Sequence, residues 1–230
     1  LKNNDQFISG TDINIQVQLT DLDQIKNLKV YFGEELKYDS KPAKDQEFIN
    51  IKTDSVKVGF TNIKLVASYE GEKKPTIDNR TVVIFSSKSP ELLMAKKVNK
   101  FPHEISNYTQ GLEFDGNQLW ESTGQRGSSI VAKVDLNSGK IIEKVDLDPA
   151  LFGEGITILN DKIYQLTWQS GKCKVYDKNT LELINEFVFS GEGWGITNDG
   201  EELIMTDGTS RIFFRNPETF EVTKSLYVFD

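Results

Sequence analysis

The sequence predicts an all-β protein with two domains, an N-terminal Ig-like β-sandwich followed by a β-propeller domain. Two observations favour this fold class. Residues 1–88 contain short runs in which apolar and polar side chains alternate with a period of two, which is typical of strands. The second part of the chain repeats one motif at spacings of 44 and 40 residues, which is typical of propeller blades.

The runs in the first part are rich in β-branched and aromatic residues, and polar connectors such as residues 21–27 and 71–79 separate them. About seven short strands in fewer than about ninety residues are typical of an Ig-like sandwich. No catalytic constellation accompanies them. The clearest runs are residues 13–19, 28–32, 56–60, 63–67 and 81–85.

A domain boundary is predicted near residue 88. Residues 86–90, Ser-Ser-Lys-Ser-Pro, are small and polar and end in proline, which is typical of an interdomain linker. We therefore expect the Ig-like domain over residues 1–88 and the propeller domain over residues 89–230.

Three segments of the second part align without gaps, and each is followed by a hairpin with a matched turn. Such repeats, with four short strands each, are typical of propeller blades. Circular closure usually takes four to eight blades, so we expect the propeller to be incomplete at Asp230. The segments begin Gln110-Gly-Leu-Glu-Phe-Asp-Gly, Glu154-Gly-Ile-Thr-Ile-Leu-Asn and Trp194-Gly-Ile-Thr-Asn-Asp-Gly.

Composition excludes several function classes. The chain has 35 acidic and 27 basic residues and a net charge of −8, which disfavours nucleic acid and anionic membranes as partners. Cys173 and His103 are the only residues of their types, so a disulfide within the chain and a Cys/His zinc site are excluded. No run approaches the ~18 apolar residues of a membrane span.

The residue before each shared glycine is a candidate site position. Innermost strands of propeller blades line a central channel, so equivalent positions converge there. This position holds Gln110, Glu154 and Trp194, while a second equivalent position has Trp168 in one repeat and glycine in the other two. A carboxylate near two indoles would be partly desolvated, which raises its pKa and suits it to general acid and base catalysis. The alternative is that Glu154 is an ordinary turn residue and the tryptophans are packing residues.

The order and spacing of several short motifs resemble the plant and bacterial glutaminyl-peptide cyclotransferases, whose fold is a five-bladed β-propeller. The resemblance covers about 130 residues of the second domain and does not extend to residues 1–88. The motifs are Pro102-His103, Tyr108-Thr-Gln-Gly-Leu112, Glu121-Ser-Thr-Gly124, Leu151-Phe-Gly-Glu-Gly-Ile-Thr157, Gln165-Leu-Thr-Trp168, Gly191-Glu-Gly-Trp-Gly-Ile-Thr197 and Thr206-Asp-Gly-Thr209.

The resemblance implies an enzyme that converts the N-terminal glutamine of peptides or proteins to pyroglutamate and releases ammonia. The substrate's α-amine attacks its own side-chain amide, so the protein must hold a near-attack conformer and move protons. The resemblance assigns the general acid and base to Glu154. It implies that Gln110, Trp168 and Trp194 bind the substrate, with Glu192 in a secondary binding role.

The resemblance further implies a metal-independent acyltransferase without a required cofactor. A structural Ca²⁺ in the propeller channel, held by backbone oxygens, is an additional expectation. The family also draws an asparagine, a tryptophan and a lysine from later blades, which we expect beyond Asp230. The implied location is outside the cytoplasm of a bacterium, either periplasmic or secreted. A lipid anchor upstream of this chain is compatible with that location.

Two other function classes fit the sequence less well. A noncatalytic propeller that binds peptides or glycans, with the Ig-like domain as a spacer, has no need for a carboxylate at Glu154. A propeller lactonase or similar hydrolase requires a metal-binding set of channel carboxylates and amides, and only Glu154 and Gln110 fit such a set.

Overall fold

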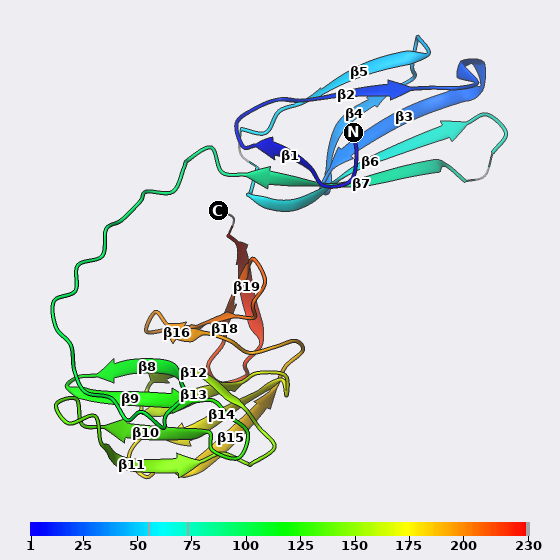
Figure 1. Ribbon diagram of the computed structural model, residues 1–230. Coiled ribbons are helices and arrows are strands. Elements are labelled where there is room, and N and C mark those ends of the chain that lie inside the picture. Colours follow the sequence, from blue (N-terminus) through cyan, green and yellow to red (C-terminus); the bar gives the residue numbers. More distant parts are fainter. Residues whose placement is uncertain (55, 73, 229–230) are drawn as a thin grey trace. The chain divides into compact units, whose positions relative to one another are not determined.

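The computed structural model describes residues 1–54, 56–72 and 74–228. Over these residues the regular secondary structure consists of strands and one 3₁₀ helix, η1 (Leu22–Gln24), which confirms the predicted all-β class. None of the described residues lies in a helix long and apolar enough to cross a membrane. The chain divides into two compact units, Leu1–Leu92 and Leu93–Tyr227 (Figure 1).

In the described part of the first unit, the strands form two sheets. A larger sheet has the strand order β1-β7-β6-β3-β4, in which β1 runs parallel to β7, and a smaller sheet pairs β2 with β5. The strands are β1 (Asp5–Ile8), β2 (Ile13–Gln18), β3 (Ile25–Phe32), β4 (Glu35–Ser40), β5 (Gln46–Ile51), β6 (Gly59–Tyr69) and β7 (Thr76–Phe85).

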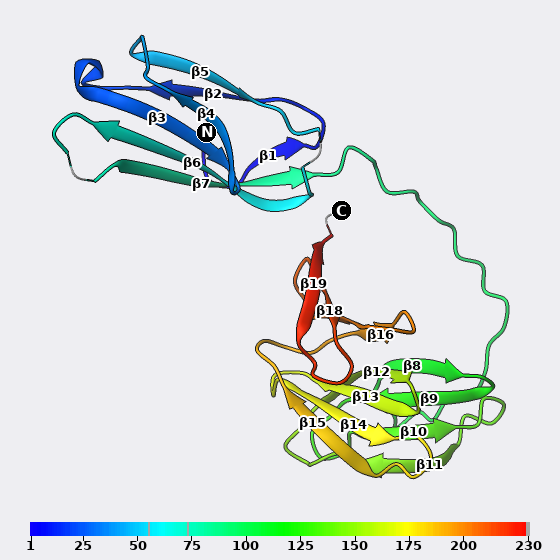
Figure 2. The same cartoon turned by 180° about the vertical axis from the view of Figure 1, so that it is seen from behind.

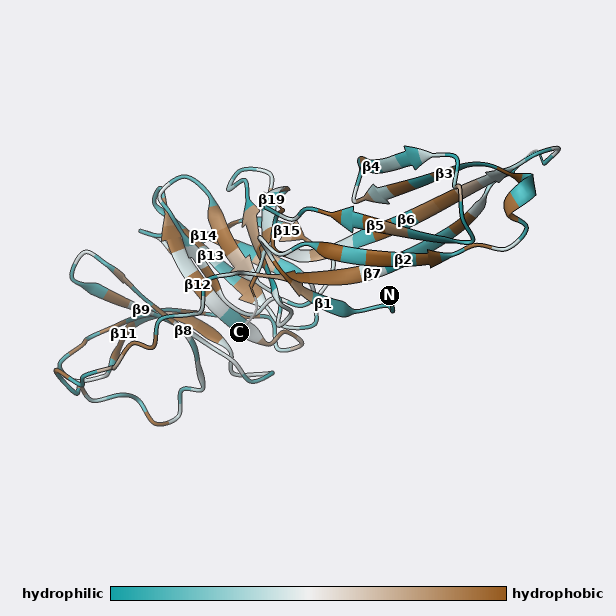
Figure 3. Ribbon diagram, turned by 90° about the horizontal axis from the view of Figure 1, so that it is seen from above, coloured by the Kyte–Doolittle hydropathy of each residue, from teal (hydrophilic) through white to brown (hydrophobic). Residues whose placement is uncertain are grey.

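An apolar core lies between these two sheets. Along β2, Ile13, Ile15 and Val17 are buried and the residues between them are exposed. They belong to one cluster with Leu28 of β3 and Ile63 of β6. Figure 3 shows the apolar and polar segments along the strands. The period of two therefore gives β2 one buried face and one exposed face.

In the described part of the second unit, the strands form three four-stranded antiparallel sheets, seen from behind in Figure 2. Each sheet contains one of the sequence repeats. The first two repeats begin within the first strand of their sheet, at Gln110 and Glu154, and the third begins at Trp194, two residues before the first strand of its sheet. The first sheet contains β8 (Thr109–Asp115), β9 (Gln118–Thr123), β10 (Ile130–Val134) and β11 (Ile141–Asp146). The second contains β12 (Gly153–Leu159), β13 (Lys162–Thr167), β14 (Lys172–Asp177) and β15 (Leu183–Val188). The third contains β16 (Ile196–Asn198), β17 (Leu203–Thr206), β18 (Arg211–Arg215) and β19 (Val222–Tyr227).

The first strands of these sheets lie next to one another, with β12 between β8 and β16. A Cβ atom added to Gly111 would lie 2.7 Å from the backbone nitrogen of Ile156, and one added to Gly155 would lie 2.7 Å from that of Ile196. Neighbouring backbones therefore approach too closely for a side chain at these two positions, which explains why the repeat keeps glycine there.

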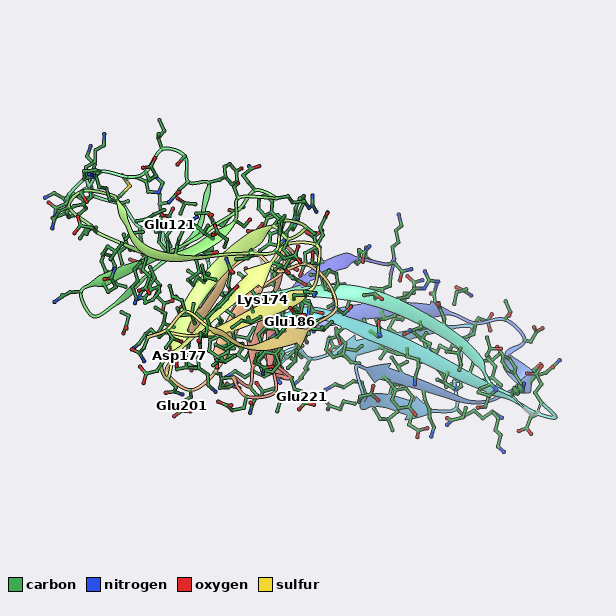
Figure 4. All side chains as sticks on the ribbon, turned by 90° about the horizontal axis from the view of Figure 1, so that it is seen from below. Glu121, Lys174, Asp177, Glu186, Glu201 and Glu221 are labelled. Carbon is green, nitrogen blue, oxygen red and sulfur yellow. The ribbon has the colours of Figure 1, made fainter. Side chains whose placement is uncertain are left out.

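The matched turns of the repeats have a common hydrogen bond. The side chains of Asp135, Asp177 and Asn216 each accept a hydrogen bond from the backbone N–H three residues later, at 2.7, 2.9 and 3.1 Å. A short side-chain oxygen that accepts hydrogen bonds from nearby backbone N–H groups stabilises a turn locally. Figure 4 labels Asp177 at the end of β14.

Candidate active site

The repeat position before the shared glycine lies at a β-bulge. The register of β12 with β13 shifts by one residue just after Gly153, next to Glu154, and that of β8 with β9 shifts at Gln110. Trp194 and the residue after it both bond to the backbone of Thr206, at 3.1 and 2.9 Å. A bulge turns a side chain away from the regular alternation of a strand. The orientation of the side chain is therefore set by a bulge at all three positions.

The backbone on both sides of Glu154 is closely packed. A Cβ atom on Gly153 would lie 2.5 Å from the carbonyl oxygen of Thr123, and one on Gly155 would lie 2.7 Å from that of Trp194. The N–H of Gly155 also donates to the Trp194 carbonyl at 2.8 Å. Glu154 thus lies within strand β12 and between neighbouring sheets, not in a surface turn.

The carboxyl group of Glu154 is partly buried. The side-chain amide of Gln110 donates to its Oε1 atom at 3.4 Å. Burial, with a smaller contribution from the negative charge of Glu192, raises the pKa of Glu154 to about 7. A carboxyl group with this pKa can both accept and release a proton near neutral pH, which general acid and base catalysis requires.

Glu192 binds the indoles of both candidate tryptophans. Trp168 and Trp194 donate their Nε1–H groups to the same carboxylate oxygen, at 2.8 and 3.0 Å. The hydrogen bonds from Trp194 and Trp168 hold the pKa of Glu192 below its ordinary value. Glu192 therefore stays ionised at pH values where Glu154 holds a proton. The sequence singled out Glu192 but did not predict its contacts with the indoles.

A further aromatic residue, Phe152, was missed by the sequence-based reasoning. Its ring packs edge-on against Trp168 and Tyr108, with centroid distances of 5.7 and 6.2 Å. A Cβ atom on Gly124 would lie 2.3 Å from this ring, so glycine at that repeat position leaves the space that Phe152 fills. Its place directly before the Gly-Glu-Gly motif was the available signal.

The structure therefore brings the five predicted site residues into two linked groups. Gln110 bonds to Glu154, and Trp168 and Trp194 bond to Glu192. The charge of Glu192 acts on Glu154 and connects the groups. The described residues contain no group of three or more His, Cys, Asp or Glu side chains arranged to hold a metal ion.

His103 belongs to a separate cluster. The carboxylate of Glu121, labelled in Figure 4, is only 1% exposed. It contacts the His103 ring at 2.9 Å and accepts hydrogen bonds from Asn107 at 2.8 Å and from Thr109. These bonds tie the segment before β8 to strand β9, so the contacts of His103 are structural.

Comparisons with known proteins point to one family. The profile of the glutamine cyclotransferase family matches residues 65–230. A glutaminyl-peptide cyclotransferase of Arabidopsis thaliana is 40% identical over 128 residues, which are 55% of this chain and 40% of the relative. The crystal structure of Myxococcus xanthus glutaminyl cyclase matches with a TM-score of 0.53 and 26% identity, over 57% of this chain and 56% of that one. The chain thus spans less than two thirds of the length of either relative.

Proposed function

The chain belongs to the glutamine cyclotransferase family, and on this premise we propose that the protein is a glutaminyl-peptide cyclotransferase, which converts the N-terminal glutamine of peptides or proteins to pyroglutamate. The observation that carries the proposal is the pKa of about 7 at Glu154, in a strand where neighbouring sheets meet. The identity with the Arabidopsis thaliana glutaminyl-peptide cyclotransferase supports it.

The reaction needs a proton carrier and a shaped pocket. The α-amine nitrogen bonds to the side-chain carbonyl carbon, and the bond from that carbon to the amide nitrogen breaks. Ionised Glu154 takes a proton from the attacking amine and returns it to the departing nitrogen, which leaves as ammonia. One carboxyl group with a pKa near neutrality serves both steps.

The other site residues position the substrate and the carboxyl group. Gln110 orients the Glu154 carboxylate through its amide. Trp168 and Trp194, held by Glu192, would pack against the methylene groups of the folded-back glutamine side chain. This holds the amine close to the carbonyl carbon, and such positioning supplies much of the acceleration of an intramolecular reaction.

The remaining features belong to the same proposal. The second unit would be part of a five-bladed propeller, and the first unit, with its two sheets around one core, would be an Ig-like domain. Catalysis would need no metal, and any Ca²⁺ in the channel would be structural. The enzyme would be a bacterial acyltransferase that acts outside the cytoplasm.

The test is a cyclisation assay with a peptide that begins with glutamine, following ammonia release. We expect Glu154→Gln to lower the rate by about 10²–10⁴-fold, because glutamine cannot carry the proton. The matched control is Glu201→Gln, which makes the same change at an exposed turn residue and should retain the wild-type rate.

Two results would count against the proposal. Equal rates for wild type and Glu154→Gln would remove Glu154 from the mechanism. Absence of turnover by the wild-type protein, with the peptide still bound, would favour the noncatalytic binding module.

A further inference from the structure

A chain of buried polar side chains leads to the backbone of Glu154 from behind. Gln165 of β13 donates from its amide to the hydroxyl of Ser122 at 2.8 Å, and Ser122 donates to the carbonyl oxygen of Glu154. Gln165 also bonds to the carbonyl of Ile130 at 3.3 Å and accepts a hydrogen bond from Tyr176 at 3.4 Å.

The members of this chain are fully enclosed. Ser122 and Gln165 are each 0% exposed, and Tyr176 is 3% exposed. A buried polar group left without a partner is costly, and buried networks rigidify the structure when every member is satisfied. These hydrogen bonds need glycine at position 153, because a Cβ atom there would lie 2.8 Å from the Gln165 amide nitrogen.

These buried side chains bond to β12 at the point where its pairing with β13 is interrupted. The one-residue shift between Gly153 and Ile156 leaves Glu154 without a partner residue in the register with β13. Ser122 lies on β9 of the neighbouring sheet, so its bond fixes a bulged peptide from the outside. A bulged peptide held in this way has a defined orientation, and the side chain that it carries is aimed accordingly.

We propose that Ser122 and Gln165 are positioning residues for Glu154: their buried hydrogen bonds fix the bulged peptide of Glu154 and thereby place its carboxyl group for proton transfer. The inference rests on the proposed function for its catalytic consequence. Its structural part, the immobilisation of the bulge, does not depend on any substrate.

The experiment compares Ser122→Ala with Thr157→Val in the full chain. Thr157 is also fully buried on β12, and its hydroxyl accepts a hydrogen bond from Asn198 of the next sheet at 2.8 Å. Each variant therefore removes one buried hydroxyl that links β12 to a neighbouring sheet, but only Ser122 bonds to Glu154. Gln165→Met serves as a second variant, because it keeps the length of the side chain and removes the amide.

The first readout is hydrogen–deuterium exchange in residues 152–156, which needs no substrate. Ser122→Ala and Gln165→Met should accelerate exchange at the amide of Gly155 by about 10-fold or more, equivalent to the loss of about one hydrogen bond. Thr157→Val should leave it at the wild-type rate. Unchanged exchange in Ser122→Ala, or equal acceleration in the control, would overturn the proposal.

The second readout is cyclisation. Misplaced reacting groups lower the rate without weakening binding, so kcat should fall by about 10–100-fold in Ser122→Ala while KM stays within about twofold. Thr157→Val should keep the wild-type kcat. If the wild type turns over and Ser122→Ala keeps its kcat, the positioning role is wrong. If the wild type does not turn over, the proposed function fails, and the exchange readout still decides whether the bonds hold the bulge.

Discussion

The side-chain amide of Gln110 donates a hydrogen bond to the carboxylate of Glu154 at 3.4 Å, although the two residues are 44 positions apart in the chain. The repeat places both residues at equivalent bulges of adjacent strands. At this distance the bond is weak, so it orients the carboxyl group without strongly favouring the ionised form. This is consistent with the raised pKa of Glu154.

We expect Glu192→Gln to move the acid limb of the pH profile of kcat/KM to lower pH. Because Glu154 must be ionised to accept a proton, the wild-type limb should have a midpoint near the pKa of about 7. Removing the negative charge of Glu192 removes one of the causes that raise the pKa of Glu154. The charge of Asp207, which acts on Glu192, is unchanged in this variant. The measurement is kcat/KM between about pH 5 and 9.

The control for this shift is Glu186→Gln. Glu186 pairs with Lys172 and Lys174, the latter labelled beside it in Figure 4, and is not among the causes of the raised pKa of Glu154. Its variant should keep the wild-type limb. A limb that stays in place in Glu192→Gln would show that the charge of Glu192 does not act on the titrating group.

Trp168 and Trp194 should be energetically coupled, because their indoles share one oxygen of Glu192. Phenylalanine at either position removes the donor and keeps an aromatic ring. We expect each single variant to lower kcat/KM by about 10-fold, the equivalent of one hydrogen bond to a charged group. The double variant should depart from additivity by about 0.5 kcal/mol or more. Additive losses would show that the two indoles act independently.

The sequence predicted the repeat frame and the residues at its site position. Gly111 and Gly155 could be aligned because a close backbone approach tolerates only glycine, and such a constraint is visible as a fixed residue type. The bulges at Gln110 and Glu154 could not be predicted, since a one-residue shift in pairing leaves no trace in the alternation of a short strand.

Contacts made by residues outside the repeat frame also could not be predicted from the sequence. Glu192 precedes β16 in a loop, so no periodicity determines which side chains it meets. The space beside Gly124 and Gly208 is occupied by the rings of Phe152 and Trp194, and a missing side chain does not indicate what fills its place. These details depend on packing between sheets, which the pattern of residues along one strand does not determine.

We expect Gly155→Ala to destabilise the protein more than Gly195→Ala. The new Cβ atom at position 155 would lie 2.7 Å from two backbone atoms, whereas at position 195 the nearest atom is the side-chain oxygen of Thr206 at 3.0 Å. Backbone cannot move aside as a side chain can, so Gly155→Ala should lower the free energy of unfolding by about 1–3 kcal/mol. Urea unfolding measures both variants, and equal losses would contradict the close approach of β12 and β16.

The raised pKa of Glu154 predicts how Glu154→Gln changes stability with pH. Between the ordinary value of 4.5 and about 7, the folded protein holds a proton that the unfolded chain has released. The wild type therefore loses stability as the pH rises through this range. Glutamine does not ionise, so the variant escapes this loss.

The measurement is thermal unfolding of wild type and Glu154→Gln from about pH 4 to 8. The difference in Tm should be constant below about pH 4.5, shift in favour of the variant as the pH rises towards 7, and be constant again above it. The matched control is Glu201→Gln, which makes the same substitution at an exposed carboxyl group. A difference in Tm between wild type and Glu154→Gln that is independent of pH would mean that Glu154 titrates alike in the folded and unfolded protein. Its burial in β12 would then give it no special capacity to carry a proton at neutral pH.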